Sequence, residues 1–600
     1  MQNLNLFKIL RIRYVEGALN GVTQPSVIAS TEAEATPMDL PSVHAPRVTT
    51  ELPIGLSDLI SADGAAPSRV DIILGVMKLA REILIHYKYV SEQAPQILSV
   101  RRHDESTVRV QAQIACTSEA SFKAAVRIAD AVFHHHIANG ETISLLSPAF
   151  KRQILVIRKF APSGFNTSFI LKEAHRRKIP WLHIAGNVYQ LGVGKKARLF
   201  NSSETDKTSS IGTKLATNKL YAHEFLRKAG FPVVPSLSIQ NETDAKRAAL
   251  QIGFPVVVKP QNTEGGKGVA ALLDSEAEVV AAFRAAQKFS QSVLVEKHFV
   301  GNDYRIHVVL GEVQGIIHRD PAHIIADGIH TVAELVESEN ENRRNATDDR
   351  KYLHAITINQ EAERLLARQS LAISSTPQRG QKVQLRAAAS IATGGEPLQI
   401  DRDRIHPDNA QLCIDICRLF HLDIAGVDLL IPNIEESWRH SGAHICEVNH
   451  KPQMFTTLFA PMFDKFFDET AGRIPLWIVM EPPGTYEISL QAMQQLSGVC
   501  DSVCWVTKEK RQVNGKDLSG GQSILETAQQ ALLDRSVGGV IVTIDEPLDL
   551  SSGWPFSYCD RFIEADDNQW QSDGKLERDR LRREIHRTLK PNEVLIADTN

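Results

Sequence analysis

The sequence predicts a multidomain α/β protein, and three observations support this fold class. The chain has 600 residues, enough for about four domains of about 150 residues each. Hydrophobic residues make up 43% of the chain and charged residues 23%, as in ordinary globular proteins. Segments with the alternation of strands and segments with helical spacing follow one another along the chain. Together these features exclude a small binding module, a fibrous repeat and a wholly disordered chain.

Charge, hydropathy and cysteine usage narrow the partners and the compartment. The 67 Lys and Arg residues nearly balance the 71 Asp and Glu residues, so the net charge of -4 offers no overall positive field to a nucleic acid backbone. We find no 18-residue apolar run, and the N-terminal segment lacks the apolar stretch of a signal peptide. The seven cysteines show no CxxC spacing, which is typical of reduced thiols. We expect a cytoplasmic protein with no nucleic acid and no membrane partner.

Residues 1–160 are expected to form an N-terminal α/β domain. Its predicted elements are strands at 7–15 and 106–116 and helices at 70–87 and 118–136. Three consecutive histidines, His134 to His136, close the second helix. Because adjacent residues on a helix point about 100° apart, a helix end is a better interpretation of these histidines than a metal site.

Residues 161–470 carry most of the polar motifs. The run VVVKP is expected to be a buried strand that ends near Lys259, followed by the glycine-rich stretch TEGGKGV at 263–269 and then by an apolar helix. Glycines in this context let backbone N–H groups approach phosphate oxygens. The stretch is not a Walker A loop, because Lys267 is followed by Gly268. Taken alone, it could equally be a flexible surface turn.

A second lysine, Lys219, and a downstream set of oxygen donors favour the phosphate interpretation. Asp428 lies in the strand-like run IAGVDLL. Glu447 and Asn449 are two residues apart in HICEVNHKP, so they project from the same face of a strand. Carboxylate and amide oxygens are ligands that suit Mg²⁺ at a nucleotide. The alternative for a buried carboxylate is a structural ion pair.

A long, ordered series of motifs resembles the ATP-grasp ligase of cyanophycin synthetases. The series comprises TDKTSSIGTKLATNKLYAHEFLRKAGFPVVP, VVVKP with GGKG, VEKHFVGNDYRIHVV, RDPAHIIADGIHTVAELVESENENRR, ATGG, IHPDN, LDIAGVDLL and CEVNHKP. The segments KILRIRYVEG, EAHRRKIPWLHI and LGVGKKARL resemble the first domain of that enzyme and its junction. The likeness covers about residues 6–470 and implies an ATP-grasp fold for 161–470.

The resemblance implies a role around ATP for each matching residue. Lys219 and Lys259 would hold the α- and β-phosphates. The loop that closes over the phosphates would contain Gly265, Gly266, Lys267 and Gly268. The residues around adenine and ribose would be Glu296, Lys297, Phe299 and Asp303.

The resemblance also implies which groups face the reaction. The groups close to the reacting phosphoryl and carboxyl groups would be Arg305, Arg319, Lys267 and His323. Mg²⁺ would be held by Asp428, Glu447 and Asn449. The substrate side would be formed by Ser390, Thr393, Gly394, Gly395 and Lys451.

Two stretches depart from the family's pattern where the acceptor carboxylate or the incoming amine should bind. The loop ASIATGG places Ser390 and Ala392 at altered positions, and KPQ at 451–453 replaces the family's Ala-Pro-Gly. Lys451 could bind a substrate carboxylate as a point charge, and a lysine that points into solvent is the alternative. We expect the substrate choice to differ from that of the family.

Residues 471–600 resemble a shortened Mur ligase-like domain. The strand RIPLWIVM runs into EPPGTYEIS, where Glu487 and Ile488 stand near the Lys-Thr pair expected of a phosphate loop. The chain also ends about a third short of the usual length of the family. We therefore expect a degenerate, truncated Mur ligase-like α/β domain without a nucleotide site of its own.

These features lead us to expect an ADP-forming carboxylate–amine ligase that uses ATP and Mg²⁺ and acts through an acyl phosphate. The resemblance implies amino acid or peptide substrates, such as the dipeptide β-aspartyl-arginine joined to a peptide C-terminus, and a homo-oligomer, either dimer or tetramer. One alternative is an ATP-grasp ligase that makes a small peptide or natural product. Another is a pseudo-ligase that acts as a peptide-binding subunit.

Overall fold

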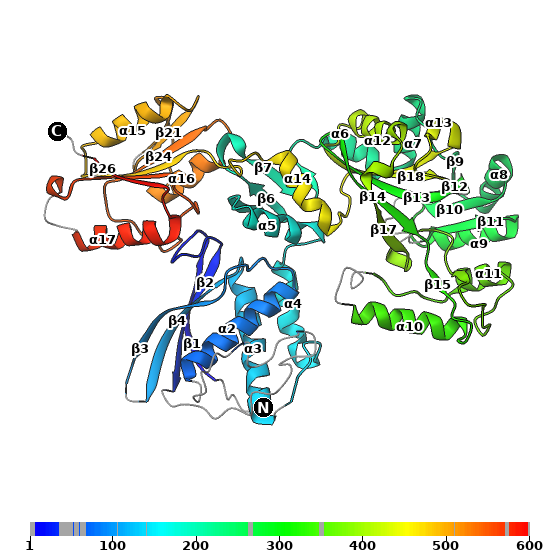
Figure 1. Ribbon diagram of the computed structural model, residues 1–600, viewed down its shortest axis with the longest axis horizontal. Coiled ribbons are helices and arrows are strands. Elements are labelled where there is room, and N and C mark those ends of the chain that lie inside the picture. Colours follow the sequence, from blue (N-terminus) through cyan, green and yellow to red (C-terminus); the bar gives the residue numbers. More distant parts are fainter. Residues whose placement is uncertain are drawn as a thin grey trace. The chain divides into compact units, whose positions relative to one another are not determined.

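The computed structural model divides the chain into two compact units. It describes residues 6–34, 52, 59, 68–104, 106–139, 141–261, 268–299, 301–346, 353–389, 391–508, 510–570 and 575–597. One unit combines Met1–Ser202 with Phe466–Asn600, and the other is Ser203–Lys465. Figure 1 shows their helices and strands. The division into domains at residues 160 and 470 stays a prediction.

The N-terminal part of the first unit is an antiparallel sheet in the order β1-β2-β4-β3, packed against helices. The strands are β1 (Lys8–Val15), β2 (Ser26–Glu34), β3 (Gln96–Arg102) and β4 (Thr107–Ala115), and the helices are α2 (Arg69–His86), α3 (Glu119–Asn139) and α4 (Lys151–Phe160). Helix α2 begins at a capping box in which Ser68 and Asp71 satisfy each other's backbone N–H groups. The strands and helices expected in this region are confirmed.

The first unit continues with helix α5 (Asn166–Arg176) and a small antiparallel meander. Its strands are β5 (Trp181–Ala185), β6 (Val188–Leu191) and β7 (Arg198–Asn201).

The C-terminal part of the first unit is a seven-stranded sheet in the order β23-β22-β21-β24-β20-β25-β26. The strands are β20 (Leu476–Met480), β21 (Val503–Val506), β22 (Arg511–Val513), β23 (Lys516–Leu518), β24 (Gly539–Ile544), β25 (Arg561–Ala565) and β26 (Glu593–Ala597). Its helices are α15 (Glu487–Ser497), α16 (Ile524–Leu533) and α17 (Lys575–Glu584), the last continuing as a π-helical turn at Ile585–Leu589. Strands β20 and β24 pair in parallel and are buried throughout, as expected of strands covered on both faces.

The second unit contains an antiparallel sheet in the order β11-β10-β12-β9. Its elements are β9 (Ser236–Ile239), α8 (Glu242–Ile252), β10 (Val256–Pro260), β11 (Ala270–Leu273), α9 (Glu276–Gln287) and β12 (Val293–Lys297). The apolar helix was expected directly after the glycine-rich stretch, and this placement is wrong, because residues 270–273 form strand β11 and pair with β10, and the helix begins only at Glu276. So short an apolar run does not distinguish a strand from a helix by periodicity. The glycine-rich stretch therefore links two strands.

A five-stranded antiparallel sheet in the order β17-β14-β13-β18-β19 forms the centre of the second unit. Its strands are β13 (Asn302–Val309), β14 (Glu312–Asp320), β17 (Glu396–Ile400), β18 (Ile424–Ile431) and β19 (His444–Asn449). The surrounding elements are β8 (Glu204–Thr205), α6 (Ser210–Thr217), α7 (Lys219–Lys228), α12 (Pro407–Leu419), α13 (Trp438–Ser441) and α14 (Phe459–Phe466).

The two faces of this sheet differ because side chains alternate along a strand. On β13, Tyr304, Ile306 and Val308 belong to a buried core, which also contains residues of α12. The residues that alternate with them, Asp303, Arg305 and His307, lie on the opposite face. The alternation therefore separates a packing face from a charged face.

A smaller subdomain of the second unit has a core of its own. It consists of the paired strands β15 (His323–Ile325) and β16 (Lys382–Gln384) with helices α10 (Val332–Asn345) and α11 (Gln360–Arg368). Helix α10 begins at a capping box formed by Thr331 and Glu334.

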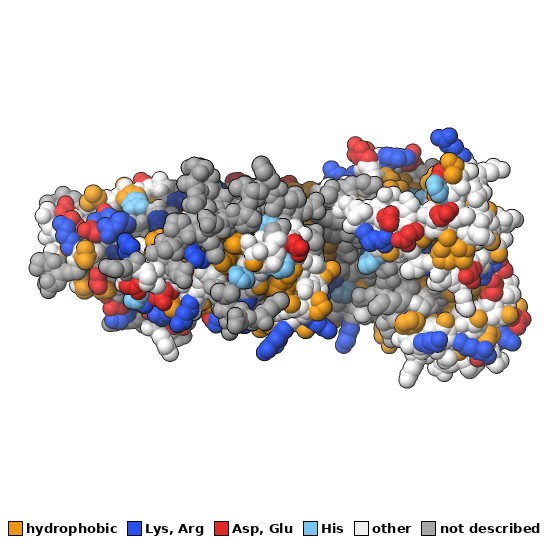
Figure 2. Space-filling view, turned by 90° about the horizontal axis from the view of Figure 1, so that it is seen from below, with side chains coloured by type: hydrophobic (Ala, Val, Ile, Leu, Met, Phe, Trp, Pro, Cys, Tyr) orange, Lys and Arg blue, Asp and Glu red, His pale blue; other side chains and the backbone are white. Residues whose placement is uncertain are grey.

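The surface carries charges of both signs. On the face in Figure 2, Lys and Arg side chains are interspersed with Asp and Glu side chains among the coloured atoms. Within the described part of the chain, every helix is too short or too polar to cross a bilayer.

Candidate active site

Lys259, at the end of β10, forms a buried ion pair with Glu296 of the neighbouring strand β12. The Lys259 Nζ lies 2.6 Å from the Glu296 Oε2, and the two residues are only 6% and 3% exposed. Burial acts to lower the pKa of Lys259, but the charge of Glu296 outweighs it and raises the pKa above the ordinary value. The site therefore holds a permanently charged ammonium group.

The second oxygen of Glu296 is a buried acceptor. Glu296 Oε1 has no hydrogen-bond partner among the described residues. His223 lies near it, with Nδ1 at 3.8 Å from Oε1. The His223 Nε2 lies 2.9 Å from the carbonyl oxygen of Cys446, and since a carbonyl only accepts, Nε2 carries the proton. Burial lowers the pKa of His223, which favours the neutral ring, and Nδ1 lies 3.3 Å from the Ser236 hydroxyl, from which it can then accept. Glu296 is thus ready to accept a hydrogen bond from a ligand such as the adenine amino group.

The other two residues expected around adenine have contacts of their own. The Lys297 ammonium donates to the carbonyl oxygens of Gly253 and Phe254, at 2.9 and 2.8 Å. The Phe299 ring lies edge-on to His444, with the centroids 4.9 Å apart. The side chain of Lys297 therefore holds the turn before β10, and it lies on the opposite face of β12 from Glu296.

On the charged face of the central sheet, Asp428 accepts hydrogen bonds from two arginines. Arg305 stands opposite Asp428 in the strand register and donates from Nε at 2.7 Å and from Nη2 at 2.9 Å. Arg319 donates from Nη2 to Asp428 at 2.8 Å and to Asp303 at 2.5 Å. Burial acts to raise the pKa of Asp428, but Arg305 and Arg319 outweigh it and lower the pKa to about 2.

The three expected metal ligands share this charged face. Asp428 of β18 stands opposite Glu447 of β19, and Gly426 stands opposite Asn449. The described residues contain no group of three His, Cys, Asp or Glu side chains that could hold a metal ion. The donor set here is two carboxylates and an amide, which fits Mg²⁺ because this ion uses only one or two protein carboxylates at a nucleotide.

Glu447 also has a cationic partner. Its Oε1 lies 3.3 Å from the Nζ of Lys219, the first residue of α7. The two lysines expected to hold phosphates, Lys219 and Lys259, are therefore both paired with carboxylates of the same unit.

Part of the loop expected to close over the phosphates lies outside the described residues, namely Gly265, Gly266 and Lys267. Gly268 is described and has a φ of +73°, where L side chains are strained. A Cβ at this position would lie 2.8 Å from the Phe289 ring and 2.9 Å from Pro260. Both the conformation and the packing at the end of the loop require glycine.

The expected substrate residues occupy a second loop, of which Ser390 lies outside the described part. Thr393 ends a short 3-10 helix, and Gly395 is buried after it. Gly394 has a φ of +96° and accepts a hydrogen bond at its carbonyl oxygen from Arg343, at 2.9 Å. His323 begins β15 with its Nδ1 at 2.9 Å from the Pro321 oxygen, so it belongs to the smaller subdomain.

Lys451 lies next to an acid that sequence reasoning did not identify. Its Nζ is 3.7 Å from the Oε2 of Glu204, and the His450 Nδ1 is 3.5 Å from the Glu204 Oε1. Glu204 belongs to β8, far away along the chain, and no sequence signal connects it with Lys451. His223 was missed for the same reason.

The candidate site is thus electrically balanced at rest. Each of its five described cations lies within 4 Å of a carboxylate, and the pairs are Lys219–Glu447, Lys259–Glu296, Arg305–Asp428, Arg319–Asp303 and Lys451–Glu204. An anion that enters the site must therefore displace these carboxylates from the cations or share the cations with them.

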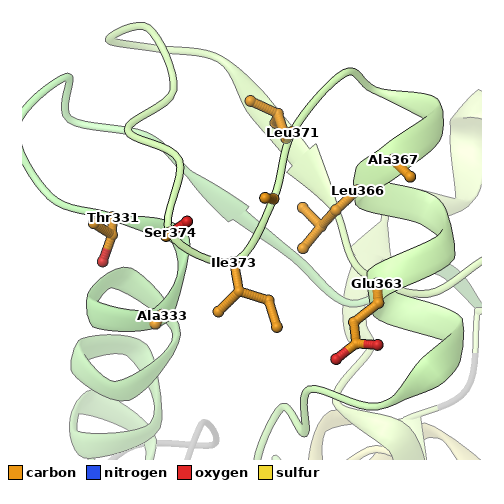
Figure 3. A pocket seen from close by; sticks show the side chains of 9 residues that line it. Thr331, Ala333, Glu363, Leu366, Ala367, Leu371, Ile373 and Ser374 are labelled. Atoms are coloured by element: carbon orange, nitrogen blue, oxygen red, sulfur yellow. The ribbon is translucent and has the colours of Figure 1, made fainter.

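The smaller subdomain contains a separate apolar cavity of about 580 Å³. Figure 3 shows Leu366, Leu371 and Ile373 around it, with the carboxylate of Glu363 from α11 at its edge. None of the residues expected to bind ATP, metal or substrate lines this cavity. We therefore do not assign the chemistry to it.

Comparison with known proteins identifies the nucleotide-binding part. Residues 218–376 match the family model of the carbamoyl-phosphate synthase L chain, ATP binding domain. The chain is 35% identical over 332 residues to a cyanophycin synthetase from Nostoc sp., a match that covers 53% of this chain and 36% of the relative. It is 32% identical over 265 residues to the glutathione biosynthesis bifunctional protein GshAB of Mannheimia succiniciproducens, covering 43% of this chain and 35% of the relative.

Among solved structures, the bifunctional glutathione synthetase from Pasteurella multocida is similar, with 23% identity and a TM-score of 0.37, covering 58% of this chain and 52% of that chain. The matched region thus spans little more than a third of the length of the curated relatives. Within that span, the chain is a homologue of cyanophycin synthetases and contains an ATP-binding domain of the ATP-grasp fold.

Proposed function

We propose that the protein is an ADP-forming, ATP-dependent carboxylate–amine ligase. The observation that carries this proposal is the set of five cation–carboxylate pairs within the unit that contains the ATP-binding domain. A surface that merely binds a neutral peptide has no need of two lysines and two arginines directed into one site. Phosphoryl transfer does, because negative charge develops on the transferred group.

The chemistry requires activation because a carboxylate is a poor electrophile. ATP supplies the γ-phosphoryl group that converts the carboxylate into an acyl phosphate, which an amine then attacks with release of phosphate. Lys219 and Lys259 hold phosphate oxygens, while Arg305 and Arg319 neutralise charge on the phosphoryl and carboxyl groups. Asp428, Glu447 and Asn449 would hold Mg²⁺, which would add to this neutralisation.

Binding must rearrange the resting ion pairs. If Glu447 held a divalent ion, its carboxylate would share its charge with that ion, and the Lys219 ammonium, now 3.3 Å from the Glu447 Oε1, would interact more strongly with a phosphate oxygen. The same reasoning applies to Asp428, which would hold Arg305 and Arg319 less strongly if it were a metal ligand. The residues therefore favour joint binding of metal and nucleotide over binding of either one alone.

For the substrates, we propose amino acids or dipeptides such as β-aspartyl-arginine, joined to a peptide C-terminus as the cyanophycin synthetase relatives suggest. A cytoplasmic homo-oligomer, dimer or tetramer, belongs to this proposal. The GshAB relatives favour a second candidate, a ligase for a small peptide of the glutathione type. Lys451 and Gln453 replace residues of the family's pattern, and this is one reason to expect that the substrates of this protein differ from those of its relatives.

The experiment is a screen for ATP-dependent phosphate release over amino acids, β-aspartyl dipeptides and short cyanophycin primers, followed by mass spectrometry of the products. Extension of a primer supports the polymer substrate, and a free small peptide supports the second candidate. Binding of ATP and peptide without phosphate release would instead identify a peptide-binding pseudo-ligase and overturn the proposed reaction.

A further inference from the structure

The loop that follows β19, residues 450–453, is fixed at its backbone but not at its charged side chain. Ser203 Oγ donates to the carbonyl oxygen of Pro452 at 2.8 Å, and the His307 Nε2 lies 3.1 Å from that of Gln453. Both contacts hold main-chain atoms. The position of Lys451 on the loop is therefore defined independently of where its ammonium group points.

This loop lies beside the charged face of the central sheet. A Cβ built on Gly426 of β18 would lie 3.0 Å from the Cβ of Pro452 and 3.3 Å from the Cδ of Arg305. Pro452 and the stem of Arg305 therefore flank the same glycine. Lys451 is adjacent to Pro452 and two residues after Asn449, which places it at the edge of the candidate active site.

Among the five ion pairs of the site, the pair of Lys451 and Glu204 is the loosest. Its 3.7 Å separation is beyond hydrogen-bond distance, whereas the other four cations approach their partners to between 2.5 and 3.3 Å. Lys451 is also the most exposed of the five cations, at 33% of its side chain. A partly hydrated, loosely held pair is the easiest to exchange for ligand charges.

We propose that Glu204 and Lys451 form a substrate subsite that binds the zwitterionic backbone end of an amino acid or dipeptide. The ligand's carboxylate contacts Lys451 and its ammonium group contacts Glu204, so that one resting ion pair becomes two intermolecular ones. Thr213 and His450 also contact Glu204, at its other oxygen Oε1, and keep the carboxylate in place. This inference rests on the proposed ligase function and names the substrate class that the site selects.

The test is equilibrium binding and therefore does not depend on turnover. β-Aspartyl-arginine is titrated by calorimetry into the full chain with Mg²⁺ and ADP, in its free form, with its aspartyl α-carboxyl group amidated, and with its α-amino group acetylated. The wild-type protein is expected to bind the free form about tenfold more tightly than either blocked form, as for loss of one ion pair of about 1.4 kcal/mol.

Two variants test which residue contacts each charged group of the ligand. Lys451→Met should remove the preference for the free form over the amide, and Glu204→Gln should remove the preference over the N-acetylated form. ADP affinity should change less than twofold in both. Glu224→Gln and Lys228→Met, which alter an exposed pair on α7, serve as matched controls.

Two results would overturn the subsite. One is the absence of binding of the free dipeptide to the wild-type protein. The other is equal weakening of all three forms in both variants, because this would mean that the pair only holds the loop. Tight and selective binding without ligation in the phosphate-release screen would overturn the proposed function and leave the subsite intact.

Discussion

The central sheet of the second unit, called the charged sheet here, and the seven-stranded, largely parallel sheet of the first unit, called the parallel sheet, both bury a carboxylate but satisfy it in different ways. In the charged sheet, Asp428 accepts hydrogen bonds from the side chains of Arg305 and Arg319. In the parallel sheet, Glu481 follows β20 and accepts from the backbone N–H groups of Ile488 and Ser489 at the start of α15, at 3.1 and 3.3 Å. The hydroxyl of Ser489 also donates to Glu481.

This difference decides which site can receive a phosphate. Backbone N–H groups at a helix start after a strand are where many nucleotide folds hold phosphate oxygens. In the parallel sheet, the chain's own carboxylate already occupies that position, and it is fully buried. In the charged sheet, the carboxylates hold arginine side chains, which could turn to an anion if the carboxylates were bound to a metal. The first arrangement closes an anion site, and the second prepares one.

The largest expected effect is at Lys259. Lys259→Ala should reduce ligation at least about 100-fold, because it removes a cation from the developing phosphoryl charge. Phosphate release under saturating substrates measures this, with Lys246→Ala on the exposed face of α8 as the matched control. Because the variant leaves Glu296 buried without its partner, Lys259→Met combined with Glu296→Gln separates lost folding from lost chemistry. Activity within threefold of the wild type would contradict the assignment.

His307, on the charged face of the central sheet, should make the folding stability depend on pH. Burial, followed by the charge of Arg305, lowers the pKa of His307 from an ordinary value of 6.5 to about 4. Below pH 6.5 the unfolded chain therefore binds a proton that the folded chain does not bind until about pH 4, so folding stability falls across this window by at most about 3 kcal/mol. His307→Gln should flatten this part of the pH dependence of urea unfolding. An unchanged slope between pH 6.5 and 4 would show that His307 titrates normally.

A substitution at Glu481 tests whether its carboxylate occupies the anion-binding position at the start of α15. Glu481→Gln places an amide donor against backbone N–H donors, which should cost about 1–3 kcal/mol of stability in thermal or denaturant unfolding. Glu487→Gln, at an exposed position in the first turn of α15, is the control. In the wild-type chain, calorimetry should find a single ATP site. Two equivalent sites per chain would break the comparison between the sheets.

The smallest expected effect is on ADP binding at Glu447, and its sign depends on whether the metal is present. Glu447→Gln should weaken binding of ADP in the presence of Mg²⁺ but strengthen binding in EDTA by a few-fold to about tenfold, because Lys219 loses its competing carboxylate. Titration calorimetry with and without the metal measures both, and Glu224→Gln provides the control. If the variant binds metal-free ADP no better than the wild type, the exchange of partners at Lys219 is wrong.

Sequence periodicity predicted the strands that organise the candidate site. The strand-like run IAGVDLL contained Asp428, and the spacing of two residues in HICEVN placed Glu447 and Asn449 on one strand face; the register adds that Asp428 stands opposite Glu447. The strand at 270–273 could not be predicted, because four apolar residues carry no decisive period and pairing with β10 determines their conformation.

The ion-pair and hydrogen-bond partners of the charged groups could not be predicted from the sequence. Ser203 and Pro452 are 249 residues apart, and only the fold brings that segment, with Glu204, against the loop of Lys451. The same holds for His223, whose proton position follows from a carbonyl on β19. Residue types indicated the chemistry, whereas the pairing of each cation with an acid emerged only from tertiary structure.

The strict alternation of faces along β13 and β18 has a consequence for protein engineering and for natural insertions. Adding one residue within either strand would rotate its charged residues into the apolar core and its core residues onto the charged face. Adding two residues would preserve the faces but shift Arg305 or Asp428 along the strand by about 6.8 Å, beyond reach of its partner. Insertions and deletions compatible with the site are therefore confined to the loops between these strands, and alignments that place a gap within β13 or β18 can be rejected on geometric grounds.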